Sequence, residues 1–500
     1  MTLTRVLTTS SVLALLAGPA LADLTAEDVL ADQLAQIALY GLDAQANGQS
    51  RSGDVLTVES LTATASIPEE DASVELTIGG AMFTEQGDGS VIITYPNEIP
   101  ISVTVSIPDE DDISISMDLN QSDMQTVVSG TPQQFRYEFT GSSISLDDIE
   151  IDIPDESVTF DMGIAVDMTG LLGVMNITAG EIRPYDIDVT ADAIKLAMDM
   201  SVPEESMNFN ILYDIKSLAA VYSGTLARQN IMDSFAQSIA NGNTTSGTFQ
   251  HGQATYDIDM NLPDADFDAD ATVASGSYAF SMDESGIDYS GQYNNMNLTV
   301  GLGSMGLPPM NFTMAEAGGR LQMPVVPGED PQDFALVTTL VDMEIDPFVW
   351  SMIDPAEQLP RDPATIIIDT TGEVVLTEDI FAADYGQGPI TAPPGQINAL
   401  AINEIKVSLA GAELTGDGDL TFNNQFGIPM PIGVVNVMLK GGNTLLDTLV
   451  AMNLIPEEQA MGARMMTGMF ARPGDGPDTL VSTIEMKEDG SILANGQRIK

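Results

Sequence analysis

The stretch "ISVTVSIPDEDDISISMDL" spans residues 101–119 and holds the pattern that decides the fold. Apolar residues occupy every second position on both sides of Pro108, and Ser, Thr and Asp fill the positions between them. Successive side chains of a strand point to opposite faces of its sheet. The stretch therefore predicts an antiparallel hairpin with one apolar face and one polar face.

The same alternation returns along the chain, at residues 158–168, 194–202, 256–262 and 296–302. The alternation also predicts a pair of strands before residues 101–119, and the apolar residues of these two strands are expected to face one another. This pair is expected to bring together Leu61, Ala63, Ala65 and Ile67 with Val74, Leu76 and Ile78.

A recurring turn motif lies between such strands, in which an apolar residue and a proline precede a cluster of acids. Its copies read "SIPEED" (66–71), "SIPDED" (106–111), "DIPDES" (152–157) and "SVPEES" (201–206), with weaker copies at 261–266 and 306–311. Proline donates no backbone hydrogen bond and suits the end of a strand. The sequence predicts a mainly β, α+β fold: a long antiparallel meander of repeated hairpins that forms a curved, half-open sheet or groove with short helices packed on it.

Helical spacing interrupts this pattern in a few places. A helix is predicted over residues 25–41, where Thr25 and Asp28 form a capping box in its Asp variant. A second helical insert is predicted near 226–242, with Ile231, Phe235 and Ile239 on one side. Residues 346–372 read as a helical connector that leads into a strand at 366–368.

The C-terminal third mixes both patterns. A loop is predicted near 385–395, a hairpin over 402–424, a helix over 443–455 and a further helix opened by Pro456. The chain is expected to close on a hairpin that turns at Asp489-Gly490. We divide the sequence into a signal peptide (1–22), a hairpin region with an N-terminal helix and a helical insert (23–340), and an α+β region (341–500).

The first residues have the features of an export signal. Arg5 precedes a short apolar run, and Ala20-Leu21-Ala22 fits the small-residue pattern of a cleavage site. Cleavage is expected after Ala22, which predicts a periplasmic or otherwise exported protein. No later apolar run is as long as a membrane-spanning helix requires, so the mature chain is expected to have no transmembrane segment.

Composition excludes several classes of function. The chain has no cysteine, which excludes disulfides, thiolate nucleophiles and Cys-metal sites. It carries 74 acids against 16 bases, a formal charge of -58. Nucleic acid and anionic lipid headgroups need a basic surface, so neither is an expected partner.

The C-terminal third resembles an exported bacterial family known as domain of unknown function 2125. The resemblance rests on "WSMIDPAEQLPRDPAT" (350–365), "LAGAELTGDGDLTF" (409–422), residues 442–470 and the closing "SILANGQRIK", and is best over residues 340–500. It implies a location in the cell envelope and a β-rich fold, and it carries no activity or catalytic residues.

Motifs for chemistry are weak. "GLGSMG" (301–306) matches a dinucleotide-binding pattern, but prolines follow where a helix is needed, so a Gly-rich strand end is expected. His251 is the single histidine, which argues against a catalytic triad or a multi-histidine metal centre. It is expected to be a partly exposed strand residue. Carboxylates are so abundant that no pair stands out as a hydrolytic site.

Two acidic patterns leave cation binding open. Asp264, Asp266, Asp268 and Asp270 alternate, so a strand would place all four carboxylates on one face. Calcium prefers such oxygen ligands, yet a solvated polar face is the favoured interpretation. Asp417 and Asp419 form a second candidate pair, for which an ordinary hairpin turn is favoured.

The last signal is methionine, of which the chain has 28. Methionine adapts to irregular apolar surfaces, so these residues fit an ordinary core or a groove for apolar ligands. Those on the predicted apolar strand faces are Met162, Met168, Met198, Met200, Met260 and Met296. Trp350 is expected to be a packing anchor beside the Asp354-Pro355 turn.

From these observations we expect a non-enzymatic periplasmic protein of the cell envelope whose one-faced apolar sheet binds or shields lipid-like ligands. No catalytic or cofactor-binding residue is assigned, and metal ligands and protein partners are left open. The alternative is a structural or interaction module of the envelope whose acidic hairpin turns are bridged by calcium.

Overall fold

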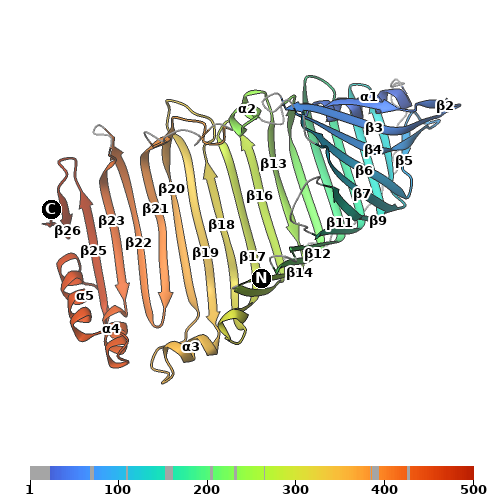
Figure 1. The fold of residues 1–500 in the computed structure, drawn as a ribbon. Helices are drawn as coiled ribbons and strands as arrows, with labels where there is room; N and C mark the ends of the chain where they lie inside the picture. The colour runs from blue at the N-terminus through green and yellow to red at the C-terminus, as the bar shows by residue number, and fades with distance from the viewer. Residues whose placement is uncertain are drawn as a thin grey trace, which may run out of the picture.

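The structure is a computed structural model that describes residues 23–67, 72–108, 111–152, 161–202, 206–229, 233–263, 265–382, 385, 393–424 and 428–500. These residues form one long antiparallel sheet, with helices along its edges (Figure 1). The prediction of a mainly β meander with few helices is confirmed. The expected signal peptide, residues 1–22, lies outside the described residues.

The strands follow one another across the sheet from the N-terminal to the C-terminal end. The first half holds β1 (Asp43–Asn47), β2 (Ser50–Ser52), β3 (Val55–Ile67), β4 (Ala72–Glu85), β5 (Val91–Thr94), β6 (Glu98–Ser106), β7 (Ile113–Ser122), β8 (Gln125–Thr131), β9 (Gln134–Asp152), β10 (Asp161–Thr178), β11 (Ile182–Val202) and β12 (Met207–Ala227). The second half holds β13 (Thr244–His251), β14 (Ala254–Leu262), β15 (Ala265–Val273), β16 (Ser275–Asp283), β17 (Gly286–Gly301), β18 (Met310–Met323), β19 (Gln332–Ile345), β20 (Ala364–Leu376), β21 (Gly395–Leu409), β22 (Ala412–Asn423), β23 (Met430–Lys440), β24 (Arg472–Pro473), β25 (Thr479–Met486), β26 (Ile492–Ala494) and β27 (Gln497–Arg498).

Several neighbouring strands in this order are two parts of one bent strand. β12 pairs with β13 through one half of its length and with β14 through the other. β13 and β14 then pair with β16 and β15, which both pair with β17. The same arrangement joins β4 to β9 through β5, β6, β7 and β8. Apart from the short strands at its ends, the sheet is therefore a simple up-and-down meander.

The predicted facing of the first strand pair is confirmed by the register. Leu61 pairs with Ile78, Ala63 with Leu76 and Ala65 with Val74. The turn motif between these strands, residues 68–71, lies outside the described residues, but the strands on either side of it pair up to Ile67 and Ala72. Strands also pair on both sides of the motif copies at 106–111, 201–206 and 261–266.

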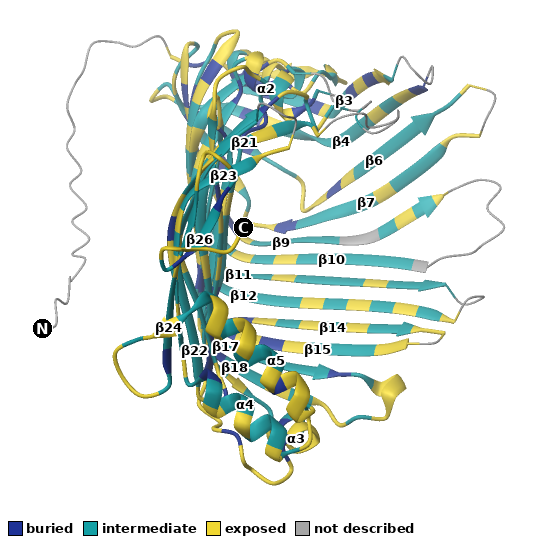
Figure 2. Ribbon diagram, turned by 90° about the vertical axis from the view of Figure 1, so that its left-hand side faces the viewer, coloured by how far each residue is buried: buried dark blue, intermediate teal, exposed yellow. Residues whose placement is uncertain are grey.

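A line of irregular residues crosses the strands and bends the sheet. Ladder pairing is interrupted at the same level on each strand, and residues with positive φ mark this level at Asp123, Gly170, Ser217, Asn295 and Asp342. Extra residues in a ladder bend the strand locally. Figure 2 shows the result: strands β6, β7, β9, β10, β11, β12, β14 and β15 project away from the wall formed by the C-terminal strands.

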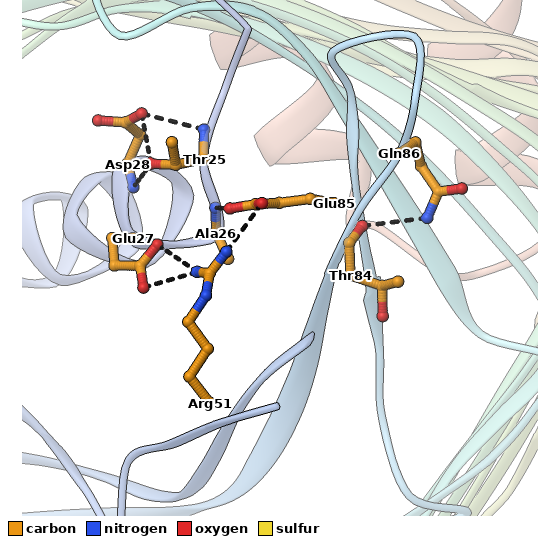
Figure 3. A network of polar contacts seen from close by, with 8 residues as sticks. All are labelled: Thr25, Ala26, Glu27, Asp28, Arg51, Thr84, Glu85 and Gln86. Atoms are coloured by element: carbon orange, nitrogen blue, oxygen red, sulfur yellow. Dashed lines mark hydrogen bonds and ion pairs between the residues drawn. The ribbon is translucent and has the colours of Figure 1, made fainter. Parts of the chain in front are cut away.

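The first helix, α1 (Ala26–Ala38), closes the N-terminal end of the sheet. The capping box is present, because the Thr25 side chain accepts from the Asp28 backbone and the Asp28 side chain accepts from the Thr25 backbone. Arg51 pairs with both Glu27 and Glu85, as Figure 3 shows. The Ala26 amide and the Arg51 guanidinium both donate to Glu85 and hold the pKa of that carboxyl below its usual value.

The apolar stripe of α1 packs on the sheet, as predicted. Val29 and Leu30 are buried against strand residues such as Phe83 and Val128. A charged pair lies inside this cluster, where the Arg183 guanidinium contacts the Asp32 carboxylate. The Tyr137 hydroxyl also donates to Asp32, at 2.5 Å.

The predicted helical insert near 226–242 is only partly right. α2 spans Phe235–Ala240, whereas Leu226 and Ala227 belong to the end of β12. These two residues pair with Arg183 and Ile182 of β11, so the ladder outcompetes the helical pattern there. Ile231 lies outside the described residues.

The predicted helices and hairpins of the C-terminal third are confirmed. α3 (Pro347–Ile353), α4 (Gly442–Ala451) and α5 (Glu457–Phe470) match the expected helices, β21 and β22 form the expected hairpin, and β25 and β26 form the hairpin around Asp489-Gly490. The loop predicted near 385–395 lies largely outside the described residues. β19 runs across residue 340, so the two regions expected on either side share one sheet.

The protein has far more surface than a compact chain of its size. Its accessible surface is 28615 Å², whereas a compact monomer of 52.9 kDa exposes about 18,000 Å². Even after about 8,000 Å² is set aside for the residues outside the described part, about 20,000 Å² remains, which still exceeds the surface of a compact monomer of the whole mass. The described apolar residues form two buried clusters, one beneath α1 and one around Trp350.

Candidate functional site: an apolar track between two pockets

A continuous row of apolar side chains crosses the middle of the sheet. Each member pairs directly with the next one on the neighbouring strand, so all members lie on one face. We call this row the apolar track; it comprises Ile99, Leu119, Leu146, Val166, Leu196, Tyr213, Tyr256, Ala271, Leu298, Phe312 and Ile345.

A second apolar row runs beside the track on the same face. It comprises Ile164, Met198, Ile211, Ile258, Ala269, Val300 and Met310. The methionines singled out in the sequence share this face; for example, Met162 pairs with Met200, which in turn lies opposite Phe209. The apolar face is therefore several residues wide along most of the sheet.

The middle of this face has no second layer above it in the part of the chain that the structure describes (Figure 2). Val166, Leu196 and Tyr213 are half-buried, and the side chains next to them on the same sheet supply this partial cover. By contrast, the far ends of the face are covered by helices. In the described part of the chain, the methionine-rich face is therefore covered at its two ends and uncovered between them.

The N-terminal end of the track enters an apolar pocket beneath α1. The pocket has a volume of about 430 Å³, and Ile99 and Leu119 of the track line it. Its other walls come from α1 and from strands β3 and β4, including Ile37, Leu61 and Phe83. We call it the N-terminal pocket.

The other end of the track enters a second apolar pocket. This C-terminal pocket has a volume of about 380 Å³ and is lined by Ile345 of the track, by Val349 and Trp350 of α3, and by Leu445 of α4. Trp350 is the packing anchor that the sequence predicted, since it is 7% exposed and packs against Leu359. The two pockets are thus joined by one uninterrupted apolar row.

The length of this connection follows from strand spacing. The track crosses ten successive strand-to-strand steps of about 4.8 Å each, which gives about 48 Å along the sheet. One leaflet of a bilayer's hydrocarbon core is about 15 Å thick. The track is therefore long enough for several acyl chains laid end to end or side by side.

The bend of the sheet brings aromatic side chains together on the apolar face. Tyr213 and Tyr256 of the track lie 5.1 Å apart between ring centroids, and Tyr256 lies 6.2 Å from Tyr293. Tyr293 stands on the other side of the bend, and on a flat sheet its backbone would be more than about 15 Å away from that of Tyr256. The sheet therefore bends toward its apolar face, which becomes the concave one.

His251 belongs to this aromatic cluster, and its expected partial exposure is wrong. The residue is 4% exposed, because the strand bends directly after it and its ring stacks on Tyr278 at 6.0 Å. Nδ1 lies 2.7 Å from the Gly252 carbonyl oxygen, and Nε2 has no hydrogen-bond partner among the described residues. The ring also needs Gly276 opposite it, since a Cβ there would lie 2.1 Å from Nε2.

The acidic pattern of β15 lies on the opposite, polar face. Asp268 and Asp270 pair directly with Asp259 and Asp257 of β14, and Asp266 pairs with Asn261. Desolvation, followed by the charges of Asp270, Asp259 and Asp268, raises the pKa of the Asp257 carboxyl. Asp264 lies outside the described residues. Within the described part of the chain, no group of three or more His, Asp or Glu side chains is arranged to hold a metal ion.

The two remaining candidates from the sequence, the Asp417 and Asp419 pair and the "GLGSMG" motif, belong to strands or strand ends. Asp417 and Asp419 do not form a hairpin turn; they lie inside β22, and the Asn436 side chain donates to Asp417 at 3.1 Å. The turn of that hairpin is instead at Ala410-Gly411, where both residues have positive φ. The "GLGSMG" motif is a strand end as expected, since β17 stops at Gly301 and only a 3-10 turn, η2 (Gly303–Met305), follows.

Among the helices of the described residues, none has both the length and the apolar character of a membrane span.

The sequence predicted the apolar faces of single strands but did not predict the track and its pockets. Periodicity shows which residues of one strand share a face, whereas the track depends on the register between strands. Its pockets depend on α1, α3 and α4, which come from distant parts of the chain.

Residues 288–494 match the model of a family described as an uncharacterized protein conserved in bacteria, DUF2125. The resemblance drawn from the sequence is thus confirmed, and the match begins earlier than expected, at β17. The matched part contains the C-terminal pocket and the last members of the track. A search of the curated proteins found no match.

Proposed function

We propose that the protein is a non-enzymatic protein of the bacterial envelope that binds lipid acyl chains along its concave apolar face. The observation that carries the proposal is the apolar track, which joins two apolar pockets across about 48 Å of otherwise uncovered sheet. A cleaved signal peptide ending at Ala22 would deliver the protein to the periplasm, where lipids cross between the two membranes.

An apolar face left in water lowers the stability of the protein. Burial of apolar surface is worth about 25 cal/mol per Å², and contiguous exposed patches above a few hundred Å² mark interaction sites. An antiparallel sheet can leave its polar face in water, but its apolar face needs a cover. An occupant along the track would supply that cover.

The chemistry of the track favours hydrocarbon over an extended peptide. A peptide laid on the face would bury backbone N–H and C=O groups, which must find hydrogen-bond partners. The strands beneath are already paired with neighbours on both sides, for example β11 with β10 and β12, so they offer none. An acyl chain has no such groups, and methionines adapt to its varied shape.

The acidic polar face fits the same role. With a formal charge of -58, the protein repels anionic headgroups from most of its surface, so selectivity is expected to come from the chains. The calcium-bridged alternative involves hairpin turns that lie mainly outside the described residues, such as 68–71 and 203–205, and stays a prediction.

The direct test is native mass spectrometry of protein purified from the periplasm without detergent, followed by solvent extraction. We expect adducts with the masses of phospholipids or fatty acids. A ligand-free spectrum under gentle conditions, together with failure to take up added fatty acid, would contradict the proposal.

A matched pair of variants locates the binding. Leu196→Gln places an amide in the middle of the track, whereas Leu212→Gln places one on the polar face of the next strand, where Leu212 is 47% exposed. We expect affinity for a fluorescent fatty acid to fall several-fold in the first variant and to stay unchanged in the second. Equal affinities in both folded variants would place the ligand elsewhere.

A further inference from the structure

The last helix of the protein exposes a stripe of methionines to solvent. Met461, Met465 and Met469 recur every four residues along α5 and are 60%, 66% and 61% exposed; Met466 beside them is 63% exposed. Residues spaced by four lie on one side of a helix. The opposite side of α5 packs inward through the small side chain of Ala460, which is 2% exposed.

Further exposed apolar residues lie on or beside the helices along the same edge of the sheet. α3, α4 and α5 lie along the same edge (Figure 1). Met352 and Ile353 at the end of α3 are 51% and 48% exposed, and Leu454 between α4 and α5 is 47% exposed. We call these seven residues the helical patch. An ion pair from Arg464 to Asp447 fixes α5 against α4.

The helical patch borders the C-terminal pocket. Ile353 belongs to both, because it is half exposed and also lines the pocket. Leu445 and Leu449 of α4 line the pocket from the same helix pair. An acyl chain entering the track from this end would therefore pass the patch first.

We propose that the helical patch docks the protein on the surface of a lipid bilayer and places the C-terminal pocket at the source of the acyl chains. The inference rests on the proposed function and names the surface from which the track is loaded or into which it is emptied. An amphipathic helix with an apolar stripe lies in the interface of a bilayer with that stripe about 5–10 Å deep.

The shape and charge of the patch favour a bilayer over a folded protein partner. The methionines lie on the convex outside of the last helix, and unbranched side chains insert between lipid tails without a matching cavity. The seven residues of the patch are uncharged, Arg464 beside them pairs with Asp447, and the chain as a whole is strongly acidic. Docking is therefore expected on zwitterionic phosphatidylcholine vesicles, to resist added salt, and to weaken as anionic lipid is added.

Methionine oxidation offers a footprint on the unaltered protein. Peroxide converts exposed methionine to the sulfoxide at a rate that depends on exposure. With phosphatidylcholine vesicles present, we expect Met461, Met465, Met466 and Met469 to be protected several-fold, while Met82, which is 46% exposed on the polar face, oxidises as before. Equal oxidation of the α5 methionines with and without vesicles would overturn the proposal.

Variants test the same contact by vesicle flotation. Replacing the four α5 methionines by glutamine keeps their length and helix propensity, and should abolish co-flotation. The matched control replaces exposed apolar residues of the polar face, as Met82→Gln, Leu172→Gln, Leu212→Gln and Val221→Thr, and should float like the wild type. Flotation of the α5 variant at the level of the control would also overturn the proposal.

The two readouts separate this inference from the proposed function. Lipid adducts in native mass spectra without protection by vesicles would refute docking and leave acyl-chain binding intact. Protection by vesicles in a protein that carries and takes up no lipid would leave the docking surface intact and refute the track as a lipid site.

Discussion

The charged pair beneath α1 shows how the N-terminal end of the sheet is held. Asp32 and Arg183 are separated by 151 positions in the sequence, and both side chains are 2% exposed. Each charge is tolerable in the core only because the other is present and because Tyr137 and Gln36 donate to the same carboxylate. The pair therefore ties the helix to β11 across the width of the cluster.

Removing one partner of this buried pair should lower the free energy of unfolding. Arg183→Met leaves the Asp32 charge buried and unpaired, and we expect a loss of about 3–5 kcal/mol in the free energy of unfolding. The control is Arg136→Met, since Arg136 pairs with Glu138 on the surface, where such a pair is worth less than about 1 kcal/mol. Urea unfolding followed by circular dichroism measures the free energy of unfolding of both variants. Equal losses in the two variants would show that the buried pair does not stabilise the contact between α1 and β11.

A second prediction concerns the acidic ladder on the polar face. Desolvation and three neighbouring carboxylates raise the pKa of Asp257 in the folded state, so its ionisation destabilises the fold as pH rises through that pKa. We expect Asp257→Asn to stabilise the protein by about 0.5 kcal/mol at pH 7 and to have no effect at acid pH, where the carboxyl is already neutral.

The control for this ladder is Asp199→Asn, because Asp199 lies opposite Asn210 instead of a carboxylate. Thermal melts across pH 3 to 8 compare the two variants. A gain in Asp257→Asn that persists undiminished at the acid end would show that charge repulsion is not its cause.

At the scale of elements, α4 depends on a cap from another part of the chain. Its N-cap is Gly441, which offers no side chain. The carboxylate of Asp478, just before β25, instead accepts from the Thr444 amide and hydroxyl, each at 2.8 Å, and from the Asn443 amide. Burial alone would raise the pKa of Asp478, but these hydrogen bonds outweigh it and leave the pKa below its usual value.

Loss of this cap should loosen α4 and with it the wall of the C-terminal pocket. We expect Asp478→Ala to cost about 1 kcal/mol at neutral pH and to speed amide exchange over residues 442–451. Because the folded pKa is lowered, the stabilisation is present at neutral pH and disappears as pH falls through that pKa, so the variant and the wild type should converge in acid. The exposed Asp475 provides the control, and Asp475→Ala should leave exchange in α4 unchanged.

At the scale of the whole molecule, the protein is a bent single-layer sheet with clusters of buried residues at two ends. A compact chain of this length has a radius of gyration of about 23 Å. We expect small-angle scattering of the purified protein to give a value clearly larger. The successive strand pairs from β3 to β25 extend about 80 Å at about 4.8 Å per step, which exceeds the diameter of about 60 Å of a compact sphere with that radius of gyration. A value near 23 Å would mean that the concave face closes on itself in solution.

The edges of the sheet explain how such a structure avoids pairing with further copies. The outermost strands β1, β2, β26 and β27 have two to five residues each. Short edge strands offer few unpaired backbone groups to another sheet. The edges therefore offer little backbone for pairing, whereas the apolar face is uncovered between its ends.

Local pattern alone determined the strands, the one apolar face of each hairpin, the capping box of α1 and the positions of α3, α4 and α5, because periodicity and capping act over a few neighbouring residues. Tertiary structure decided which parts of these faces are buried and which form the open apolar track. The apolar track from Ile99 to Ile345 depends on the register of many strand pairs. The buried pair of Asp32 and Arg183 depends on contacts between distant segments, and His251 is buried because a bend crosses the sheet. Whether an apolar face is a core or an open site depends on what lies above it, and here the helices cover only its ends.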